Sequence, residues 1–268
     1  MKIKVFTAFS GYDSQCLALD RLKRDYPYFD YDLVGWSEID KYAIQAHNAL
    51  YPQWATRNYG DITQIDWSQV PDFDLFTYSS PCQDFSNAGL QKGGEEGSGT
   101  RSSLLWECRK AIIAKRPKYL LLENVKALVS KKFKPLFLKW CDELASYGYS
   151  NFYQVLNAKD YGVPQNRERV FLVSILGEAT YSFPKPFKLD KRLKDVLEDD
   201  VDEKYYLSDK RIETLSRDNK GFKAMKPSAP HTGVASCLTA RMAKMGRGDN
   251  YISNENNNPS GEYISRHR

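Results

Sequence analysis

The stretch "DLFTYSSPCQ", residues 74–83, indicates the fold, because it has the pattern of a buried strand that stops at a proline. Its apolar and aromatic run is typical of a strand, and Pro81 ends it. Similar short apolar runs alternate with helical patterns up to about residue 176. That alternation predicts a parallel α/β sheet with helices on both faces. We therefore expect functional residues where the strands end.

The other expected elements follow from hydrophobic periodicity and from helix start and stop signals. Asp40 is a suitable N-cap for the second helix, and Pro117 ends the third. The expected strands cover residues 3–9, 31–39, 74–80, 118–124, 151–158 and 167–176. The expected helices begin near residues 14, 41, 101 and 134.

Two prolines, Pro184 and Pro186, mark the point where this pattern loosens. We expect a larger domain over residues 1–187 and a small irregular region over residues 188–268. The formal charge of the chain is +5, and basic residues outnumber acidic ones after Lys210. Such a surface suits nucleic acid, but charge alone favours an ordinary solvated surface.

Composition excludes several classes of protein. The chain has 268 residues, 41% of them hydrophobic, which is enough to bury a sizeable core. Its apolar runs are too short to span a bilayer, and "MKIKVF" is not a signal-peptide core. We therefore expect a cytoplasmic protein with no membrane contact. The five cysteines are widely spaced and form no CxxC pair, so neither a disulfide framework nor a metal site is predicted.

Polar groups follow the first two expected strands and also stand between the second strand and the third. The first strand runs into "FSGYDSQ", residues 9–15, a turn with a single glycine rather than the GxGxxG of a dinucleotide site. Glu38 follows the second strand, where it is placed to accept bonds from ribose hydroxyls. Asp61, in "GDI", is placed to read an adenine amino group. Each carboxylate is equally open to a simpler interpretation as a helix cap.

Cys82 follows Pro81 and opens a Gly- and Ser-rich loop suited to closing over a substrate. A cysteine nucleophile needs help from a cation, a base or a helix N-terminus, so Cys82 is either a nucleophile or an ordinary buried thiol. Glu123 ends the strand "YLLLEN". Arg167 and Arg169, two residues apart at the entry to the last strand, are expected to point the same way. A structural ion pair between Glu123 and Arg169 is the alternative.

In order and spacing, "FSGYDSQ", "SEIDKYA", "GDI", "SPCQDFSNAG", "RSSLLWE", "ENV" and "QNRERV" resemble the motifs of the DNA cytosine-5 methyltransferases over residues 1–187. The resemblance implies a Rossmann-like sheet that binds S-adenosylmethionine, and methylation of C5 of a cytosine flipped out of DNA. It implies that Cys82 adds to C6 of the base and that Glu123 holds the N3 edge. Arg169 would contact the O2 edge, and Arg167 would help to order the pocket. No metal is required.

The resemblance also assigns the binding residues by position. Asp13 and Ser14 depart from it, because they stand where further glycines are usual. The implied cofactor contacts are Phe9, Ser10, Gly11, Tyr12, Glu38, Ile39, Asp61, Ile62, Pro81 and Leu104. The candidate contacts to double-stranded DNA are Ser86, Gln91, Lys92, Gln165 and Arg241.

The end of the chain departs from the family pattern. Residues 235–252 resemble a segment at the edge of the target-recognition domain, with Thr239 and Arg241 as the best matches, but no terminal cofactor-site segment follows. Three explanations stay open. A partner polypeptide supplies the missing parts, the chain is a truncated and inactive DNA-binding or partner-binding module, or residues 188–268 hold an unusually small recognition region.

Other cysteine chemistry fits less well. A zinc nucleobase deaminase needs HxE and PCxxC, and neither His47 nor Cys82 has those neighbours. A Cys-His hydrolase needs a histidine base, and none of the three histidines has a suitable setting. A Rossmann oxidoreductase would need the three-glycine turn that is absent here.

Overall fold

Contacts divide the chain into two units, which are described separately. The computed structural model describes residues 2–81, 94–198, 201–216, 233–237, 251–253 and 263–265. The first unit is Met1–Val155 with Arg169–Phe183, and the second is Leu156–Glu168 with Pro184–Arg268. The break at Pro184 lies close to the boundary expected at residue 187. Residues 156–168, expected in the larger domain, group with the second unit.

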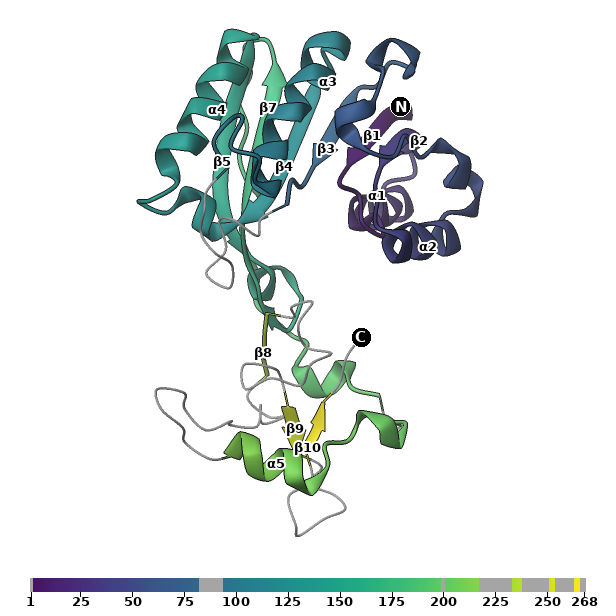
Figure 1. Cartoon of the computed structure of the whole chain (residues 1–268), viewed down its shortest axis with the longest axis vertical. Coiled ribbons are helices and arrows are strands. Elements are labelled where there is room, and N and C mark those ends of the chain that lie inside the picture. The colour runs from purple at the N-terminus through teal and green to yellow at the C-terminus, as the bar shows by residue number, and fades with distance from the viewer. Residues whose placement is uncertain are drawn as a thin grey trace. The chain divides into compact units, whose positions relative to one another are not determined.

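The strands and helices of the first unit alternate as the sequence predicts (Figure 1). Its strands are β1 (Lys2–Ala8), β2 (Asp30–Ser37), β3 (Leu75–Tyr78), β4 (Tyr119–Val125), β5 (Tyr149–Asn157) and β7 (Glu168–Leu176). Its helices are α1 (Ser14–Asp25), α2 (Lys41–Leu50), α3 (Cys108–Lys115) and α4 (Lys134–Ser146).

The strands form one six-stranded sheet in the order β2-β1-β3-β4-β7-β5. Pairing is parallel between β1 and β2, β1 and β3, and β3 and β4. The β4–β7 pair is antiparallel, so the expectation of a parallel sheet is wrong for β7. The short connection before β7 explains its direction, because only residues 158–167 join β5 to β7. A return to the same direction needs a crossover of about a dozen residues or more, usually a helix.

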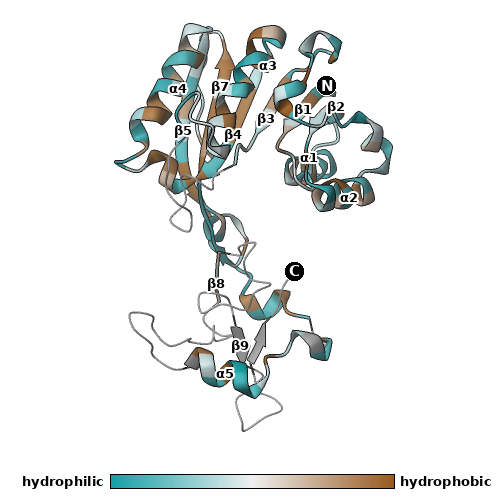
Figure 2. Cartoon of the chain, viewed as in Figure 1, coloured by the Kyte–Doolittle hydropathy of each residue, from teal (hydrophilic) through white to brown (hydrophobic). Residues whose placement is uncertain are grey.

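Helices cover both faces of the sheet because successive strand residues point to opposite sides. Phe6 packs in a core with Ile112 of α3 and Phe137 of α4. Its neighbour Val5 packs in a separate core with Cys16 of α1. In Figure 1, α3 and α4 lie across β4, β5 and β7, whereas α1 and α2 lie by β1 and β2. Figure 2 shows hydrophobic residues concentrated on β4 and β7, with hydrophilic residues along the exposed sides of the helices.

The helix expected over residues 101–116 is an α-helix only in its second half. Residues Arg101–Glu107 form a 3₁₀ helix, η4, and α3 begins only at Cys108. Two tertiary hydrogen bonds accompany the tighter winding. The Ser102 hydroxyl donates to the Pro81 carbonyl at 2.7 Å, and the Trp106 indole donates to the Gly94 carbonyl at 2.8 Å. Periodicity within the segment contains no signal for such long-range partners.

The second unit has shorter elements. Strands β6 (Gln165–Asn166) and β8 (Ala235–Ser236) pair in parallel, and β9 (Tyr251–Ser253) pairs antiparallel with β10 (Tyr263–Ser265). Helix α5 spans Asp209–Ser216. A small core contains Leu193 and Ala235, in keeping with the irregular region expected there. Within the described ranges, no helix is both long enough and apolar enough to cross a membrane.

Phe137 supplies a stability test with an adjacent control. Its side chain is fully buried, and its ring makes an edge contact with Tyr153 at a centroid distance of 4.9 Å. We expect Phe137→Ala to lower the free energy of unfolding by about 3–5 kcal/mol because it leaves a cavity. The neighbouring Leu138 is 40% exposed, so Leu138→Ala should change it by less than about 1 kcal/mol. Denaturant unfolding of both variants measures the difference, and equal midpoints would contradict this packing.

Candidate active site at the strand ends

A pocket of about 490 Å³ lies beyond the ends of the first strands of the sheet. It is lined by Phe9, Ser37, Glu38, Ile39, Asp40, Gly60, Asp61, Ile62, Pro81 and Leu104. Most of the residues assigned to cofactor binding by position therefore meet around one cavity, although they come from five separate stretches of the chain. Ser37, Asp40 and Gly60 were not predicted. Ser10, Gly11 and Tyr12 do not line the pocket but lie in the turn beside it.

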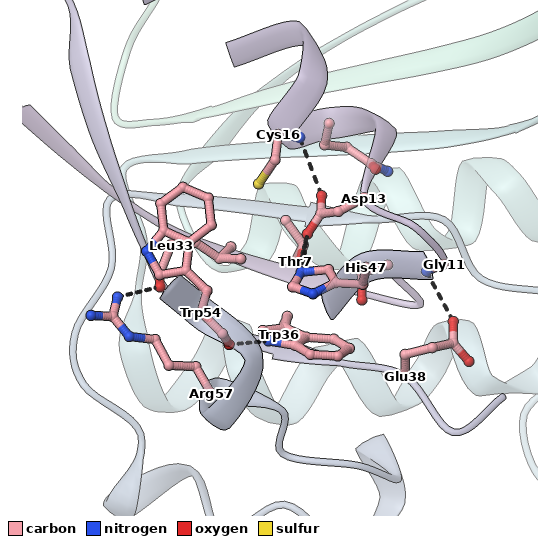
Figure 3. Close-up of polar contacts among 12 residues, drawn as sticks. Thr7, Gly11, Asp13, Cys16, Leu33, Trp36, Glu38, His47, Trp54 and Arg57 are labelled. Carbon is pink, nitrogen blue, oxygen red and sulfur yellow. Dashed lines mark hydrogen bonds and ion pairs between the residues drawn. The ribbon is translucent and has the colours of Figure 1, made fainter. Parts of the chain in front are cut away.

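Glu38 is held by backbone donors from two directions. Its Oε2 accepts the Gly11 N–H at 3.0 Å, and its Oε1 accepts the N–H groups of Ile39 and Asp40 at 2.8 and 2.9 Å. Figure 3 shows the bond between Gly11 and Glu38 across the turn. A carboxylate accepts about four hydrogen bonds, so Glu38 retains capacity for a ligand hydroxyl.

Asp40 and Asp61 act as caps while lining the pocket. Asp40 Oδ1 accepts the N–H groups of Tyr42 and Ala43, both at 2.9 Å, at the start of α2. Asp61 Oδ1 accepts the Thr63 N–H at 2.9 Å at the start of a short 3₁₀ helix, η2 (Ile62–Gln64). The capping interpretation is therefore correct for both residues. Capping does not compete with ligand binding, because each of these bonds uses one oxygen of a two-oxygen group.

Asn58 organises the pocket floor without lining it. Its Oδ1 accepts the N–H groups of Glu38 and Gly60, at 3.2 and 2.9 Å, and its Nδ2 donates to the Glu38 carbonyl at 3.1 Å. Gly60 has a φ of +71°, a conformation that side chains disfavour. Asn58, two residues before "GDI", thus joins that motif to the end of β2. No periodicity identifies such a residue, although an Asn shortly before a glycine is a turn signal.

The backbone that leads to Cys82 is fixed on two sides. Asn124, buried in β4, donates from Nδ2 to the Ser80 carbonyl at 3.1 Å. The Ser102 hydroxyl donates to the next carbonyl, that of Pro81. The asparagine of "ENV" therefore positions the end of the segment that begins at β3. Cys82 itself, with Ser86, Gln91 and Lys92, lies outside the described residues, as does Arg241.

Glu123 and Arg169 face each other on adjacent antiparallel strands. Arg169 Nε lies 3.1 Å from Glu123 Oε1, and the two side chains are 17% and 27% exposed, respectively. The ion pair kept as an alternative is thus present. Both charged groups remain partly open to solvent, so the pair is accessible to a polar ligand.

Arg167 has different partners from Arg169. Strand β7 begins at Glu168, so the premise that both arginines lie in one strand is wrong. Arg167 belongs to the second unit, where its Nη1 lies 3.6 Å from Cys237 Sγ. Gln165 belongs to the same unit, and β6 pairs it with Ala235. The sequence motif "QNRERV" therefore spans the division between the two units.

Burial makes three of the other four cysteines poor nucleophiles. Removal from water raises the pKa of Cys16 and of Cys108 well above the ordinary value, and Asp13 adds to the effect at Cys16. The same cause raises the pKa of Cys141 to about 12. These three side chains are therefore thiols at neutral pH, and a thiol is a poor nucleophile.

Metal chemistry has no evident site in the part of the chain that the structure describes. Within those residues, no three or more His, Cys, Asp and Glu side chains gather in a way that would hold a metal ion.

Comparison with known proteins identifies the family to which the sequence is similar. The family described as C-5 cytosine-specific DNA methylase matches residues 3–265. The Type II methyltransferase M2.ScrFI of Lactococcus lactis subsp. cremoris is 39% identical over 262 residues, covering 78% of this chain and 71% of that protein. The orphan methyltransferase M.Rho11sI of Bacillus phage rho11s is 32% identical, covering 80% of this chain and 47% of that protein.

Solved structures match the fold over nearly the whole chain. The Entamoeba histolytica methyltransferase EhMeth has a TM-score of 0.77 at 17% identity, covering 94% of this chain and 76% of that one. The S. pombe Dnmt2 methyltransferase has a TM-score of 0.73 at 18% identity, covering 96% of this chain and 78% of that one. The fold is thus the α/β fold of S-adenosylmethionine-dependent methyltransferases. With its ordered motifs, its strand-end pocket and these relatives, the chain belongs to the DNA (cytosine-5)-methyltransferase family.

Proposed function

We propose that this chain transfers a methyl group from S-adenosylmethionine to C5 of a cytosine flipped out of double-stranded DNA, through a covalent bond between Cys82 and C6. The observation that supports the proposal is that the pocket, Pro81 and Glu123 lie at one edge of the sheet. The pocket at this edge is bounded by Pro81, the residue before Cys82, and Glu123, near the end of β4, pairs with Arg169, near the start of β7. These positions support a single site that combines nucleophile, acid and ligand pocket.

The residues around the pocket fit the cofactor in size and chemistry. Its volume of about 490 Å³ lies in the usual range for small-molecule sites. Glu38, Asp40 and Asp61 offer acceptors for hydroxyl and amino groups and favour a positively charged ligand. Phe9, Ile39 and the other apolar lining residues suit the flat face of a base. When bound, S-adenosylmethionine supplies a methyl group on a positively charged sulfur.

Catalysis would begin at Cys82. Its thiolate forms a bond to C6, and the C5–C6 π electrons shift toward C5 and, through C4, toward N3. C5 thereby becomes nucleophilic. Glu123 in its acid form donates a proton to N3 as negative charge develops there, and Arg169 binds the O2 edge. C5 would then bond to the methyl carbon as the bond between that carbon and the cofactor sulfur breaks, which would leave S-adenosylhomocysteine. Loss of the C5 proton to a base restores the C5–C6 double bond and expels the Cys82 thiolate, and N3 returns its proton to Glu123.

The DNA contacts are part of the same proposal. Reaching C6 requires unstacking of the target base, at a cost of about a few kcal/mol. Ser86, Gln91 and Lys92 are the candidates near the nucleophile, and Gln165 and Arg241 are the candidates in the second unit. Arg167 is proposed to order the pocket or the loop after Cys82. The second unit would then be part of a target-recognition domain, and the first would be the catalytic and cofactor-binding domain.

A second polypeptide that completes recognition is the remaining part of the proposal. The chain spans 71% of one relative and only 47% of another, so part of each relative has no counterpart among the aligned residues. Full methylation by the isolated chain would argue against a need for a partner. Because the relatives come from bacteria and phages, we propose that the protein acts in the cytoplasm of a prokaryotic cell.

Ile39 provides a test of the pocket that leaves the fold intact. Its side chain is 71% exposed yet lines the pocket, so a ligand would bury it. We expect Ile39→Ala to weaken binding of S-adenosylhomocysteine about tenfold, or ~1.4 kcal/mol, which is part of the value of burying one isoleucine. Ile113, 53% exposed on α3 and outside the pocket, is the matched control. Calorimetry that finds equal affinities for the two alanine variants would remove Ile39 from the site.

Cys82→Ser should abolish methylation while leaving DNA binding intact, because a hydroxyl is a far weaker nucleophile than a thiolate. Transfer of labelled methyl groups to DNA and a gel-shift assay measure the two properties. Cys141→Ser is the control, since burial keeps that thiol protonated. Continued methylation by the Cys82 variant would exclude the covalent mechanism. Inactive wild-type chain that still binds DNA would favour the inactive binding module.

Glu123→Gln should slow methyl transfer by about 10²–10⁴-fold, the usual contribution of a positioned proton donor. The amide keeps the shape of the side chain and a bond to Arg169, but it cannot give up a proton in the same way. Single-turnover transfer rates isolate the chemical step, and Glu178→Gln, on the exposed turn after β7, is the control. Near-normal turnover would make the Glu123–Arg169 pair purely structural.

A further inference from the structure

The turn from Phe9 to Asp13 has an unusual backbone for its sequence. Phe9, Gly11 and Asp13 have positive φ values of 56°, 59° and 66°. Glycine adopts this region freely, but a residue with a Cβ does so only when its surroundings enforce it. Asp13 stands where the family resemblance predicts a glycine. The turn therefore needs contacts that hold it in shape.

The Asp13 carboxylate supplies those contacts. The residue is fully buried, its Oδ1 accepts the Cys16 N–H at 3.2 Å, and its Oδ2 accepts the Thr7 hydroxyl at 2.8 Å. Its own N–H donates to the Ser10 carbonyl at 2.8 Å. One side chain thus joins the end of β1, the turn and the first residues of α1, as Figure 3 shows for Thr7 and Cys16.

His47 connects this carboxylate to α2. The histidine is fully buried, and its Nε2 lies 3.6 Å from Asp13 Oδ2. Its ring stacks on Trp36 at the end of β2, with a centroid distance of 3.7 Å (Figure 3). Within the described residues, Nε2 has no hydrogen-bond partner, so Asp13 is the polar group that it faces. A buried pair of this kind contributes little net stability, so a positional role is the better explanation of its presence.

The turn connects the pair to the pocket. Ser10 donates from its N–H and its hydroxyl to the Ser37 carbonyl, both at 3.2 Å. Gly11 then donates to Glu38 Oε2, a pocket carboxylate. Asp13 and His47 do not themselves line the pocket. One route from the pair to a ligand therefore runs through Gly11 and Glu38.

We propose that Asp13 and His47 are a buried positioning pair that holds the turn from Phe9 to Asp13 in its left-handed backbone and thereby orients Glu38 toward the ligand. The pair replaces the conformational freedom of a glycine-rich turn with side-chain contacts. The step from Glu38 to the cofactor rests on the proposed function. The step from Asp13 to Glu38 does not.

The first experiment tests the step that is independent of any ligand. In Asp13→Ala, amide hydrogen exchange at Gly11 should speed up by at least about tenfold, since its bond to Glu38 would lose its support. Exchange in the distant strand β7 should stay unchanged. Asp66 is the matched control, because it caps a short 3₁₀ helix through Ser68 and lies outside the pocket. Unchanged exchange at Gly11 in Asp13→Ala would overturn the proposal.

The second experiment measures ligand binding. Asp13→Asn keeps the acceptor that caps α1 but changes the group that faces His47. We expect it, and His47→Gln, to raise the Kd of S-adenosylhomocysteine about three- to tenfold, while kcat at saturating cofactor changes less than about twofold. Asp66→Ala should change neither. Equal losses in affinity for Asp13→Asn and Asp66→Ala would show a general effect on stability and would overturn the proposal.

A double-variant cycle separates positioning from general stabilisation. If Asp13 acts through Glu38, Asp13→Asn in the Glu38→Gln background should cost much less affinity than it does in the wild type. Additive losses would overturn the route through Glu38. Wild-type chain that binds no cofactor would contradict the proposed function instead, and the exchange experiment would still decide the role of the pair.

Discussion

Parallel pairing of β2, β1, β3 and β4 is the constraint on which the rest of the structure depends. Parallel strands end at one edge of a sheet, so the residues after each strand meet there even when they are far apart in the chain. Phe9, Glu38 and Pro81 follow β1, β2 and β3 in this way, and Glu123 lies near the end of β4. The same pairing also sets which face each side chain takes. A slip of one residue would move Phe6 out of its core and would displace the site with it.

Most of the buried polar groups among the described residues gather around this edge, although Thr77 and Ser174 lie within the sheet. Ser10, Asp13, Ser37, His47, Ser80, Ser102 and Asn124 are all buried, and each lies in or beside a segment that borders the pocket or leads to Cys82. Such groups stabilise a fold less than apolar packing does, but satisfied networks define one geometry. Burying polar groups at this edge therefore costs folding free energy, and their hydrogen bonds fix the backbone there. Departures from the best local choice are expected where a protein binds or reacts.

Burial sets the chemistry of three of the five cysteines. Burial holds Cys16, Cys108 and Cys141 in the thiol form, so these residues serve packing. The segment before Cys82 is instead held by its backbone, through Asn124 and Ser102. These two bonds fix the backbone after β3, at the point from which the chain continues to Cys82.

The order of strands and helices, the cap at Asp40 and most of the pocket lining were predictable from the sequence, because periodicity, capping residues and motif order are local signals. The antiparallel direction of β7, the 3₁₀ winding of η4, the separation of Arg167 from Arg169 and the contacts of Asn58 and His47 were not. Each of these depends on a partner or a connection elsewhere in the chain: the short link before β7, the carbonyls of Pro81 and Gly94, Cys237, the end of β2, and Asp13. The sequence by itself determined which residues stand at the strand ends. Only the tertiary structure decided how those ends are held, since hydrogen bonds between distant segments form after the sheet brings the segments together.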